Sequence, residues 1–305
     1  MSFEKISLQE FRPAAAFKVM GQDALTFLQG QFSNELRQPV GAAIYGLWLN
    51  QKGKVVADSH VLRQGENDFV LVSVASAADV IKKRLEDYIV ADDIALTDVT
   101  ADCHGVALVG AGSGAVLQEV AGIVPAPGKF VEAGGAWIFS GRRGATENFE
   151  MIGPEATVAG WKKKLLERGV AQSDPAVAEF ARIAAGIPLV PTDIGPADLP
   201  NEGGLDDAAI SYTKGCYLGQ EVMARLKNLG QVRRRLVVVR GRGALPAMHA
   251  ALFQGQSRVG EIRSRAGAGE DFVALAMLSL VKLDHHAGLS LAPDTPPTLT
   301  IDSRE

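Results

Sequence analysis

Cysteine is scarce in this chain, which contains only Cys103 and Cys216 among its 305 residues. Two thiols are too few for a disulfide scaffold and fit a reducing compartment. Neither lies in a Cys-x-x-Cys pair, so the sequence does not encode a cluster or zinc site with four thiolate ligands. His285 and His286 lie beside Asp284, but adjacent histidines point apart on a strand and no third ligand is near in sequence. We therefore predict no metal site.

Targeting signals and long apolar runs are also missing. The N-terminus carries Glu4 and Glu10 and has no apolar run followed by small residues, so a secretory signal is not predicted. The apolar run at residues 272–281 is about half the length of a membrane span and is typical of a strand. These absences predict a cytoplasmic protein that does not bind membranes.

Motifs for nucleotide and ester hydrolysis are absent as well. The sequence has neither a Gly-Lys-Ser/Thr phosphate-binding motif nor a Gly-x-Ser-x-Gly elbow. The net charge of −4 argues against direct nucleic-acid binding, because such binding depends on neutralising many phosphates. Neither hydrolysis nor binding of nucleic acid is therefore predicted.

A basic stretch follows residue 224 in this otherwise acidic chain. It comprises Arg225, Lys227, Arg233, Arg234, Arg235, Arg240 and Arg242. The stretch is either a solvated strand edge or a surface that attracts an anion, such as a ligand carboxylate or an acidic partner.

The hydrophobic pattern predicts an α+β fold. With 47% hydrophobic and 22% charged residues, the chain is long enough for two cores. Strand-like runs at residues 44–49, 55–62 and 69–74 predict an antiparallel meander. Helical spacing is found at residues 24–29, 76–88 and 158–168, and a further helix is expected to begin at Asp174-Pro175.

Helix ends and domain limits follow from local signals. Asp23 is the expected N-cap of the first helix and Gly30 its expected end. The proline-rich segment at 188–204 predicts an ordered loop. Short strands after residue 230 predict a small all-β domain, so we expect a core at residues 1–230, divided near 100–110, and a β domain at 231–305.

One glycine-rich pattern favours a different fold. A strand-like run leads into Gly110, Gly112 and Ala115, which is typical of a dinucleotide-binding turn, and Glu132 lies at a suitable distance. The helix that follows has little room before Pro125, whereas a parallel crossover needs a fuller helix. We therefore interpret the pattern as a turn between a strand and a helix.

The most specific pattern is the run Lys-Gly-Cys-Tyr-Leu-Gly-Gln-Glu at residues 214–221. The thiolate is the reactive form of cysteine, a neighbouring lysine favours it, and the flanking glycines permit unusual turns. A lone cysteine is more often a small buried hydrophobic residue. Because Gln220 and Glu221 add polar and acidic groups around Cys216, we predict a reactive thiol.

The segment around Cys216 resembles the signature of the YgfZ-type folate-binding proteins, which are relatives of the glycine cleavage T protein that act in iron–sulfur cluster assembly and repair. The similar segments are residues 210–225, the helix and Gln-Gly-Gln turn at 21–31, the hairpin turn at 50–54, and residues 182–188 and 199–202. Asn201 stands where glutamine is usual, and Thr213 where a second lysine is common. The resemblance covers most of the chain.

This resemblance implies a T-protein-like fold with antiparallel sheets and a small C-terminal β-barrel. It implies non-covalent binding of tetrahydrofolate or a derivative, with iron–sulfur client proteins and late-acting assembly factors as partners. Cys216 is then the reactive residue, with Lys214 favouring its thiolate and Glu221 positioning the loop or a proton.

Five residues are the predicted folate contacts: Glu202, Trp48, Gln220, Tyr217 and Arg225. A carboxylate at Glu202 can accept paired hydrogen bonds from the amino-pyrimidine edge of a pterin. An aromatic face at Trp48 can stack on the pterin ring. Arg225 begins the basic stretch that could attract the glutamate tail of a folate.

Two functions remain open at this point. The first is a folate-dependent accessory factor for iron–sulfur proteins, and the second is a folate-dependent aminomethyltransferase or demethylase like the T protein. The cysteine signature favours the first, because one-carbon transfer to folate needs a positioned carboxylate base rather than a thiol.

Overall fold

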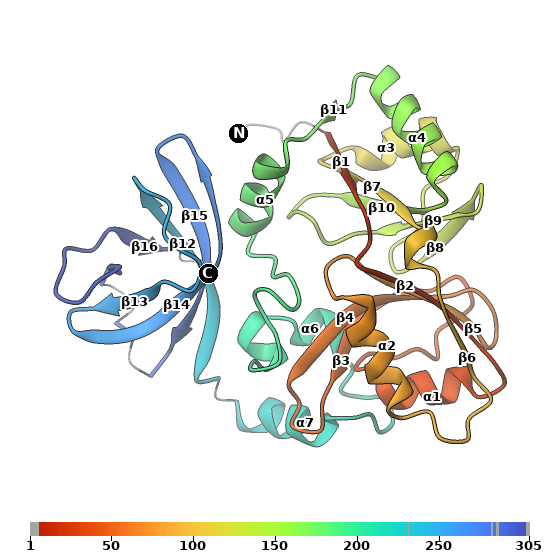
Figure 1. Ribbon diagram of the computed structural model, residues 1–305, viewed down its shortest axis with the longest axis horizontal. Helices are drawn as coiled ribbons and strands as arrows, with labels where there is room; N and C mark the ends of the chain where they lie inside the picture. The colour runs from red at the N-terminus through yellow and green to blue at the C-terminus, as the bar shows by residue number, and fades with distance from the viewer. Residues whose placement is uncertain (1–5, 231, 282, 285–286, 303–305) are drawn as a thin grey trace.

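The structure is a computed structural model that describes residues 6–302 except residues 231, 282 and 285–286. The histidine pair considered above therefore lies outside the described residues. The described chain forms three sheets, with helices packed on them and between them (Figure 1).

The first sheet confirms the predicted meander and extends it. Its order is β3-β4-β5-β2-β6, and every pairing is antiparallel. The strands are β2 (Ala15–Met20), β3 (Ala43–Leu49), β4 (Val55–Arg63), β5 (Asp68–Ser73) and β6 (Ala95–Asp98), and the helices are α1 (Ala24–Gln31) and α2 (Ala78–Glu86). Both helices bury their apolar faces against this sheet, around Phe17, Trp48 and Phe69.

The second sheet has the order β11-β1-β7-β10-β9-β8. Its strands are β1 (Ser7–Phe11), β7 (His104–Val109), β8 (Phe130–Ala133), β9 (Ala136–Ser140), β10 (Asn148–Gly153) and β11 (Ala171–Gln172). A short 3-10 turn, η1 (Thr100–Asp102), leads into β7, while α3 (Ser113–Ala121) and α4 (Glu155–Glu167) cover one face. Because β1 lies in this sheet and β2 in the first, the chain crosses between the two sheets twice.

The first two sheets share a buried interface. Val70 and Val72 of the first sheet pack with Trp137, Phe139 and Ile152 of the second. Burial of these large side chains is the principal force that holds two such layers together. The interface therefore fixes the strands of both sheets relative to one another.

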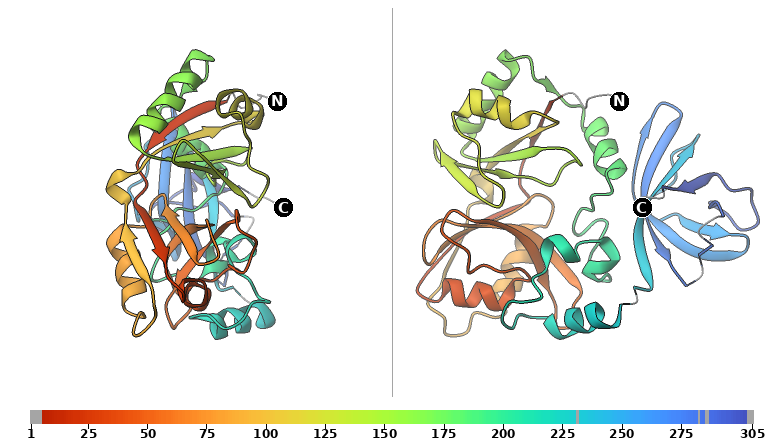
Figure 2. Two further views of the ribbon diagram at one scale, coloured as in Figure 1. Left: turned by 90° about the vertical axis from the view of Figure 1, so that its right-hand side faces the viewer. Right: turned by 180° about the vertical axis from the view of Figure 1, so that it is seen from behind.

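The third sheet is formed by the C-terminal residues and curls into a half-barrel (Figures 1 and 2). Its order is β13-β14-β15-β12-β16, with β12 (Arg234–Arg242), β13 (Ala251–Gln254), β14 (Ser257–Ala268), β15 (Asp271–Ser279) and β16 (Leu299–Ile301). Leu289 and Ser290 form bridges to Leu299 and Phe253, which links the two edge strands. The α+β fold with antiparallel sheets is thus confirmed, whereas the exact domain limits stay a prediction.

The segment between the second and third sheets runs through the middle of the molecule. It follows β11 and contains α5 (Pro175–Ala184), η2 (Pro200–Gly203), α6 (Asp206–Ala209) and α7 (Gln220–Leu229). Asp174 caps α5 as predicted, because its Oδ1 accepts a hydrogen bond of 2.7 Å from the Ala176 amide. In Figures 1 and 2, α5 lies between the second sheet and the C-terminal sheet.

The two local predictions about α1 have different outcomes. The predicted end at Gly30 is wrong, because the helix continues to Gln31 and the amide of Phe32 still bonds to the Leu28 carbonyl. Asp23 is the N-cap residue as predicted, but its side chain makes no bond to the helix. Its Oδ2 instead accepts from the amide of Asp93, a distant residue, at 2.8 Å.

The glycine-rich pattern after β7 forms the predicted turn. Gly112 has φ +89° and precedes α3, a conformation that glycine adopts without strain. The neighbours of β7 are β1 and β10, and both pair with it antiparallel. The parallel arrangement of a dinucleotide-binding fold is therefore not present around this turn.

Candidate functional site

A cavity of about 370 Å³, which we call the central cavity, lies where the first two sheets and α5 meet. Tyr45 of β3 and Asp58 and His60 of β4 form one wall, and Arg142, from the connection between β9 and β10, forms another. Glu179 of α5 lies on the third side. Segments far apart in the sequence therefore surround one space that is large enough for a small ligand.

Asp58 is firmly positioned in this cavity. Its Oδ1 accepts hydrogen bonds from the hydroxyls of Ser73 at 2.9 Å and Ser76 at 2.7 Å, and its Oδ2 accepts from the Tyr45 hydroxyl at 3.0 Å. Burial raises the pKa of Asp58, although the bonds from Ser76, Ser73 and Tyr45 oppose this effect. A carboxyl group with a raised pKa in a cavity can both donate and accept a proton.

Aromatic and cationic groups surround this carboxyl group. The ring centroids of Tyr45 and His60 are 5.1 Å apart, and the guanidinium of Arg142 lies 4.2 Å from the Tyr45 centroid. Burial and the nearby Arg142 lower the pKa of His60 to about 3, so its imidazole is neutral. The cavity thus offers flat aromatic faces, a neutral imidazole and one guanidinium around the Asp58 carboxyl group.

The Cys216 loop forms a second, separate location. Lys214 is buried, and its Nζ donates to the carbonyl oxygens of Gln29 at 2.8 Å, Phe32 at 2.6 Å and Asn34 at 2.8 Å. Burial lowers the pKa of Lys214 to about 8, and the three acceptors use every proton of its ammonium group. The lysine therefore fastens the loop to the chain at the end of α1.

Further contacts hold the same loop against two other segments of the predicted resemblance, the Gln-Gly-Gln turn at 29–31 and the hairpin turn at 50–54. The Leu218 amide donates to the Gly30 carbonyl at 3.1 Å. A Cβ on Gly219, whose φ is +86°, would lie 2.8 Å from the carbonyl oxygen of Asn50, so only glycine fits there without displacement. Between these contacts Cys216 is exposed and its thiol is free.

Comparisons with known proteins agree with this architecture. Residues 3–134 match the GCVT N-terminal domain, and residues 233–302 match the CAF17 C-terminal β-barrel domain. The glycine cleavage system aminomethyltransferase T from Bartonella henselae has the same fold, with a TM-score of 0.82 and 21% sequence identity over 98% of this chain and 86% of that one. The two matched domains, one in each half of the chain, agree with the resemblance to the YgfZ-type proteins.

Two curated relatives are longer than the part of them that this chain matches. The aminomethyltransferase of Exiguobacterium sibiricum is 28% identical over 243 residues, which are 77% of this chain and 66% of that protein. The aminomethyltransferase of Bacillus mycoides is 26% identical over 263 residues, which are 81% of this chain and 71% of that protein. The chain thus spans about two thirds of the length of these relatives.

The predicted site residues fall into two groups. Six lie on the Cys216 loop and α7: Lys214, Cys216, Tyr217, Gln220, Glu221 and Arg225. Trp48 and Glu202 lie elsewhere in the fold. None of the eight residues, all of which the structure describes, lines the central cavity. Their catalytic and folate-binding roles stay predictions.

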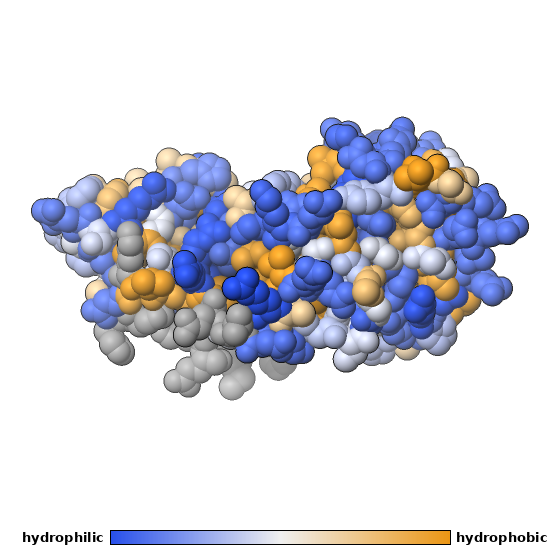
Figure 3. Space-filling view, turned by 90° about the horizontal axis from the view of Figure 1, so that it is seen from below, coloured by the Kyte–Doolittle hydropathy of each residue, from blue (hydrophilic) through white to orange (hydrophobic). Residues whose placement is uncertain are grey.

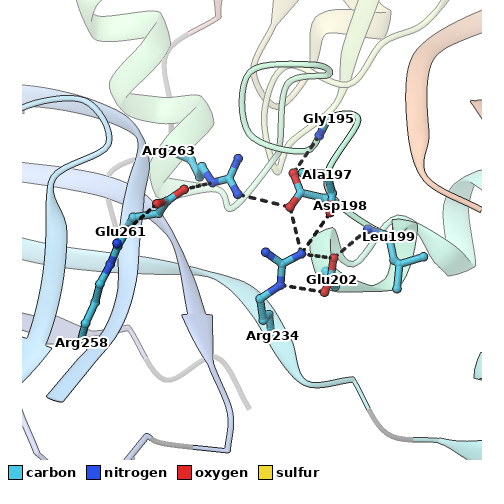
Figure 4. Close-up of polar contacts among 9 residues, drawn as sticks. All are labelled: Gly195, Ala197, Asp198, Leu199, Glu202, Arg234, Arg258, Glu261 and Arg263. Atoms are coloured by element: carbon cyan, nitrogen blue, oxygen red, sulfur yellow. Dashed lines mark hydrogen bonds and ion pairs between the residues drawn. The ribbon is translucent and has the colours of Figure 1, made fainter.

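Trp48 and Glu202 both have partners within the protein. Trp48 is fully buried, and its indole nitrogen donates to the Ser59 hydroxyl at 2.9 Å. Glu202 Oε1 accepts from Arg234 Nε at 2.9 Å, and its Oε2 accepts from Arg234 Nη2 at 2.8 Å (Figure 4). Both carboxylate oxygens of Glu202 thus already accept hydrogen bonds within the protein.

The cavity residues were not recognised in the sequence. A signal was nevertheless present, because Asp58 and His60 occupy alternate positions of β4, and alternate residues of a strand share one face. Two ionisable side chains on a strand face whose other residues, Val56 and Leu62, are apolar predict a polar cavity or a water-facing edge. Tyr45 and Arg142 carried no comparable signal.

Two further features are absent from the described part of the chain. No helix there is long and apolar enough to cross a membrane. No group of His, Cys, Asp and Glu side chains among those residues is arranged to hold a metal ion.

Proposed function

We propose that this protein binds tetrahydrofolate or a derivative in the central cavity and acts as an accessory factor for the assembly or repair of iron–sulfur proteins. The observation that carries the proposal is the aromatic, partly polar cavity around Asp58 in a T-protein-like fold. The match to a CAF17 C-terminal domain and the YgfZ-type resemblance support the iron–sulfur role.

The cavity residues fit the chemistry of a reduced folate. A volume of about 370 Å³ is within the range of small-ligand sites. Tyr45 and the neutral His60 offer flat faces to a pterin ring, Asp58 can bond to its polar edge, and Arg142 can pair with a carboxylate. When bound, tetrahydrofolate supplies ring nitrogens that can carry a one-carbon unit.

Cys216 has a different role in this proposal. Its thiol is exposed on a loop that Lys214 and Gly219 hold in place, and it does not line the cavity. Helix α7 lies at the bottom of the molecule in Figure 1. The face seen from that side is mostly hydrophilic, with scattered apolar patches (Figure 3). We assign this exposed loop to contact with iron–sulfur client proteins or late-acting assembly factors.

A titration with reduced folates tests the binding step. Trp48 bonds to Ser59, which lines the cavity, so its fluorescence should report a ligand there. We expect a saturable fluorescence change that the Trp48→Phe variant largely loses. The absence of saturable binding to the wild-type protein, measured also by calorimetry, would contradict the proposal.

A second function is favoured by one observation. Asp58 is a positioned carboxyl group with a raised pKa, which is the group that folate-dependent one-carbon transfer requires. In this alternative, Asp58 holds or accepts a proton from the amine of the donor while the cavity excludes water. Incubation with tetrahydrofolate and an aminomethyl donor should then give turnover that Asp58→Asn abolishes, whereas the accessory function predicts no turnover.

A further inference from the structure

Helix α5 has one face on the central cavity and another on the C-terminal sheet. Ala178, Glu179 and Arg182 line the cavity. On the other face Ile183 packs, together with Phe180 and Ala184, against Val238, Ala266, Val273 and Leu275. The position of the C-terminal sheet therefore sets the position of one cavity wall.

Two arginines of the C-terminal sheet reach buried carboxylates of the loop that precedes α6 (Figure 4). In addition to its two bonds to Glu202, Arg234 donates from Nη2 to Asp198 Oδ1 at 3.2 Å. Arg263 of β14 donates to the same oxygen, also at 3.2 Å. We call Asp198, Glu202, Arg234 and Arg263 the charge clamp.

The carboxylates of the clamp are rigidly held on the core side. Asp198 is 0% exposed, and its Oδ2 accepts from the Gly195 amide at 3.0 Å. Glu202 Oε2 accepts from the Leu199 amide at 2.7 Å. Buried carboxylates that lose their cations are strongly disfavoured, so the clamp resists removal of the sheet. The Arg234 side chain is 36% exposed, which leaves the clamp open to water on one side.

The loop that carries the carboxylates also contacts the cavity and α5. Pro188 and Leu189 line the cavity. Asp193 Oδ2 accepts from Arg182 Nη1 of α5 at 2.9 Å and from the Leu189 amide at 2.8 Å. The loop backbone at Asp198 also bonds to the Val55 amide, at the start of the strand that carries Asp58. The clamp thus acts on two walls of the cavity through a short, hydrogen-bonded path.

We propose that Arg234 and Arg263 are positioning residues of the central cavity, because their pairing with Asp198 and Glu202 holds the C-terminal sheet against α5 and keeps the wall closed over the ligand. Release of the clamp lets the sheet and α5 move outward together, which opens the cavity. The proposal goes beyond the proposed function, since it concerns how the cavity closes rather than which ligand it takes.

Hydrogen exchange of the ligand-free protein tests the clamp directly. Arg263→Gln leaves Asp198 paired with Arg234 and should fold, and Arg234→Lys keeps a charge but loses the two-pronged bond to Glu202. In both variants we expect amides of α5 and residues 188–193 to exchange roughly tenfold faster, a size typical of coupling between sites. Strands β14 and β15 should exchange as in the wild type.

A matched control removes a cation that does not reach the core. Arg242 lies on the same strand as Arg234 and pairs with Asp271 inside the C-terminal sheet, where both side chains are exposed. The Arg242→Gln variant should therefore exchange like the wild type throughout. Unchanged exchange of α5 in both clamp variants would overturn the proposal, and so would an equal rise across the whole C-terminal sheet, which marks a merely structural role.

The rate of ligand release gives a second readout, which rests on the proposed function. Stopped-flow release of tetrahydrofolate should be about tenfold faster in Arg263→Gln and Arg234→Lys than in the wild type and in Arg242→Gln. Equal release rates in folded variants would overturn the clamp. If the wild type binds no tetrahydrofolate, the proposed function fails, and the exchange measurement alone decides the clamp.

Discussion

The central cavity and the Cys216 loop differ in how they are enclosed. The cavity is surrounded by segments from both N-terminal sheets and α5, and burial raises the pKa of Asp58 and lowers that of His60 inside it. The loop is a surface feature whose thiol is exposed and whose neighbouring lysine bonds to backbone carbonyls. The comparison shows that the specific sequence signature marks the loop, whereas the cavity in which we propose that the ligand binds is lined by other residues.

Removal of the thiol should have the largest effect of these changes, because it should affect the function of the Cys216 loop and leave ligand binding in the cavity unchanged. We expect Cys216→Ala to lose the ability to restore an iron–sulfur enzyme in a reconstitution assay, while tetrahydrofolate binding stays as in the wild type. Cys103→Ala is the matched control, because Cys103 is buried and burial raises the pKa of its thiol to about 11. Full activity of Cys216→Ala would end the assignment of this loop to client contact.

The three hydrogen bonds of Lys214 that hold the Cys216 loop should stabilise the folded protein. Lys214→Met leaves three carbonyl oxygens without their donor, which should lower the free energy of unfolding by about 2 to 3 kcal/mol. Lys83→Met is the control, since this exposed lysine pairs only with Asp87 and should cost less than about 0.5 kcal/mol. Urea denaturation of both variants checks the difference. A loss no larger than that of the control would show that Lys214 does not hold the loop.

Acid should weaken the cavity region through His60. Its folded pKa of about 3 lies below the ordinary value of 6.5, so the unfolded chain binds the proton first as the pH falls. Stability is therefore complete above about pH 6.5 and declines towards pH 3, with a loss of about 2 kcal/mol by about pH 5. Denaturation of wild type and His60→Gln across this range should show that the variant loses part of the slope. Identical slopes would contradict a neutral, buried His60.

Replacement of the cavity carboxyl group should have the smallest of these effects, which we measure on ligand binding. Asp58→Asn keeps the shape of the side chain but changes its hydrogen-bonding capacity, so we expect roughly tenfold weaker tetrahydrofolate binding. Asp79→Asn, on the exposed first turn of α2, should bind as the wild type does. Calorimetric titration compares the two. Unaltered binding by Asp58→Asn would place the ligand outside this part of the cavity.

Local patterns predicted much of the fold. Strand-like runs identified β3, β4 and β5, and the Asp174-Pro175 pair located the start of α5, because these signals act within a few residues. The prediction that α1 ends at Gly30 is wrong, because the helix continues to Gln31 through its own backbone bonds. The Asp23 carboxylate bonds to the distant Asp93 amide instead of to the helix, and a tertiary contact of this kind has no local signature.

The candidate site was predictable only where it is continuous in sequence. Residues 214–221 form one loop, so the signature located it correctly as a unit. The expected influence of Lys214 on Cys216 assumed that neighbours in sequence interact, whereas the lysine side chain turns inward to the carbonyls after α1. Tyr45 and Asp58 lie on the paired strands β3 and β4, but Arg142 reaches them only through the packing of the second sheet on the first, which the sequence does not display.

A ligand footprint by hydrogen exchange tests most directly whether the cavity and the Cys216 loop are separate sites. With saturating tetrahydrofolate, the account predicts protection of β3, β4 and α5 and no change in residues 211–219. Protection confined to residues 211–219, with β4 unaffected, would contradict it and would place the folate at the thiol instead.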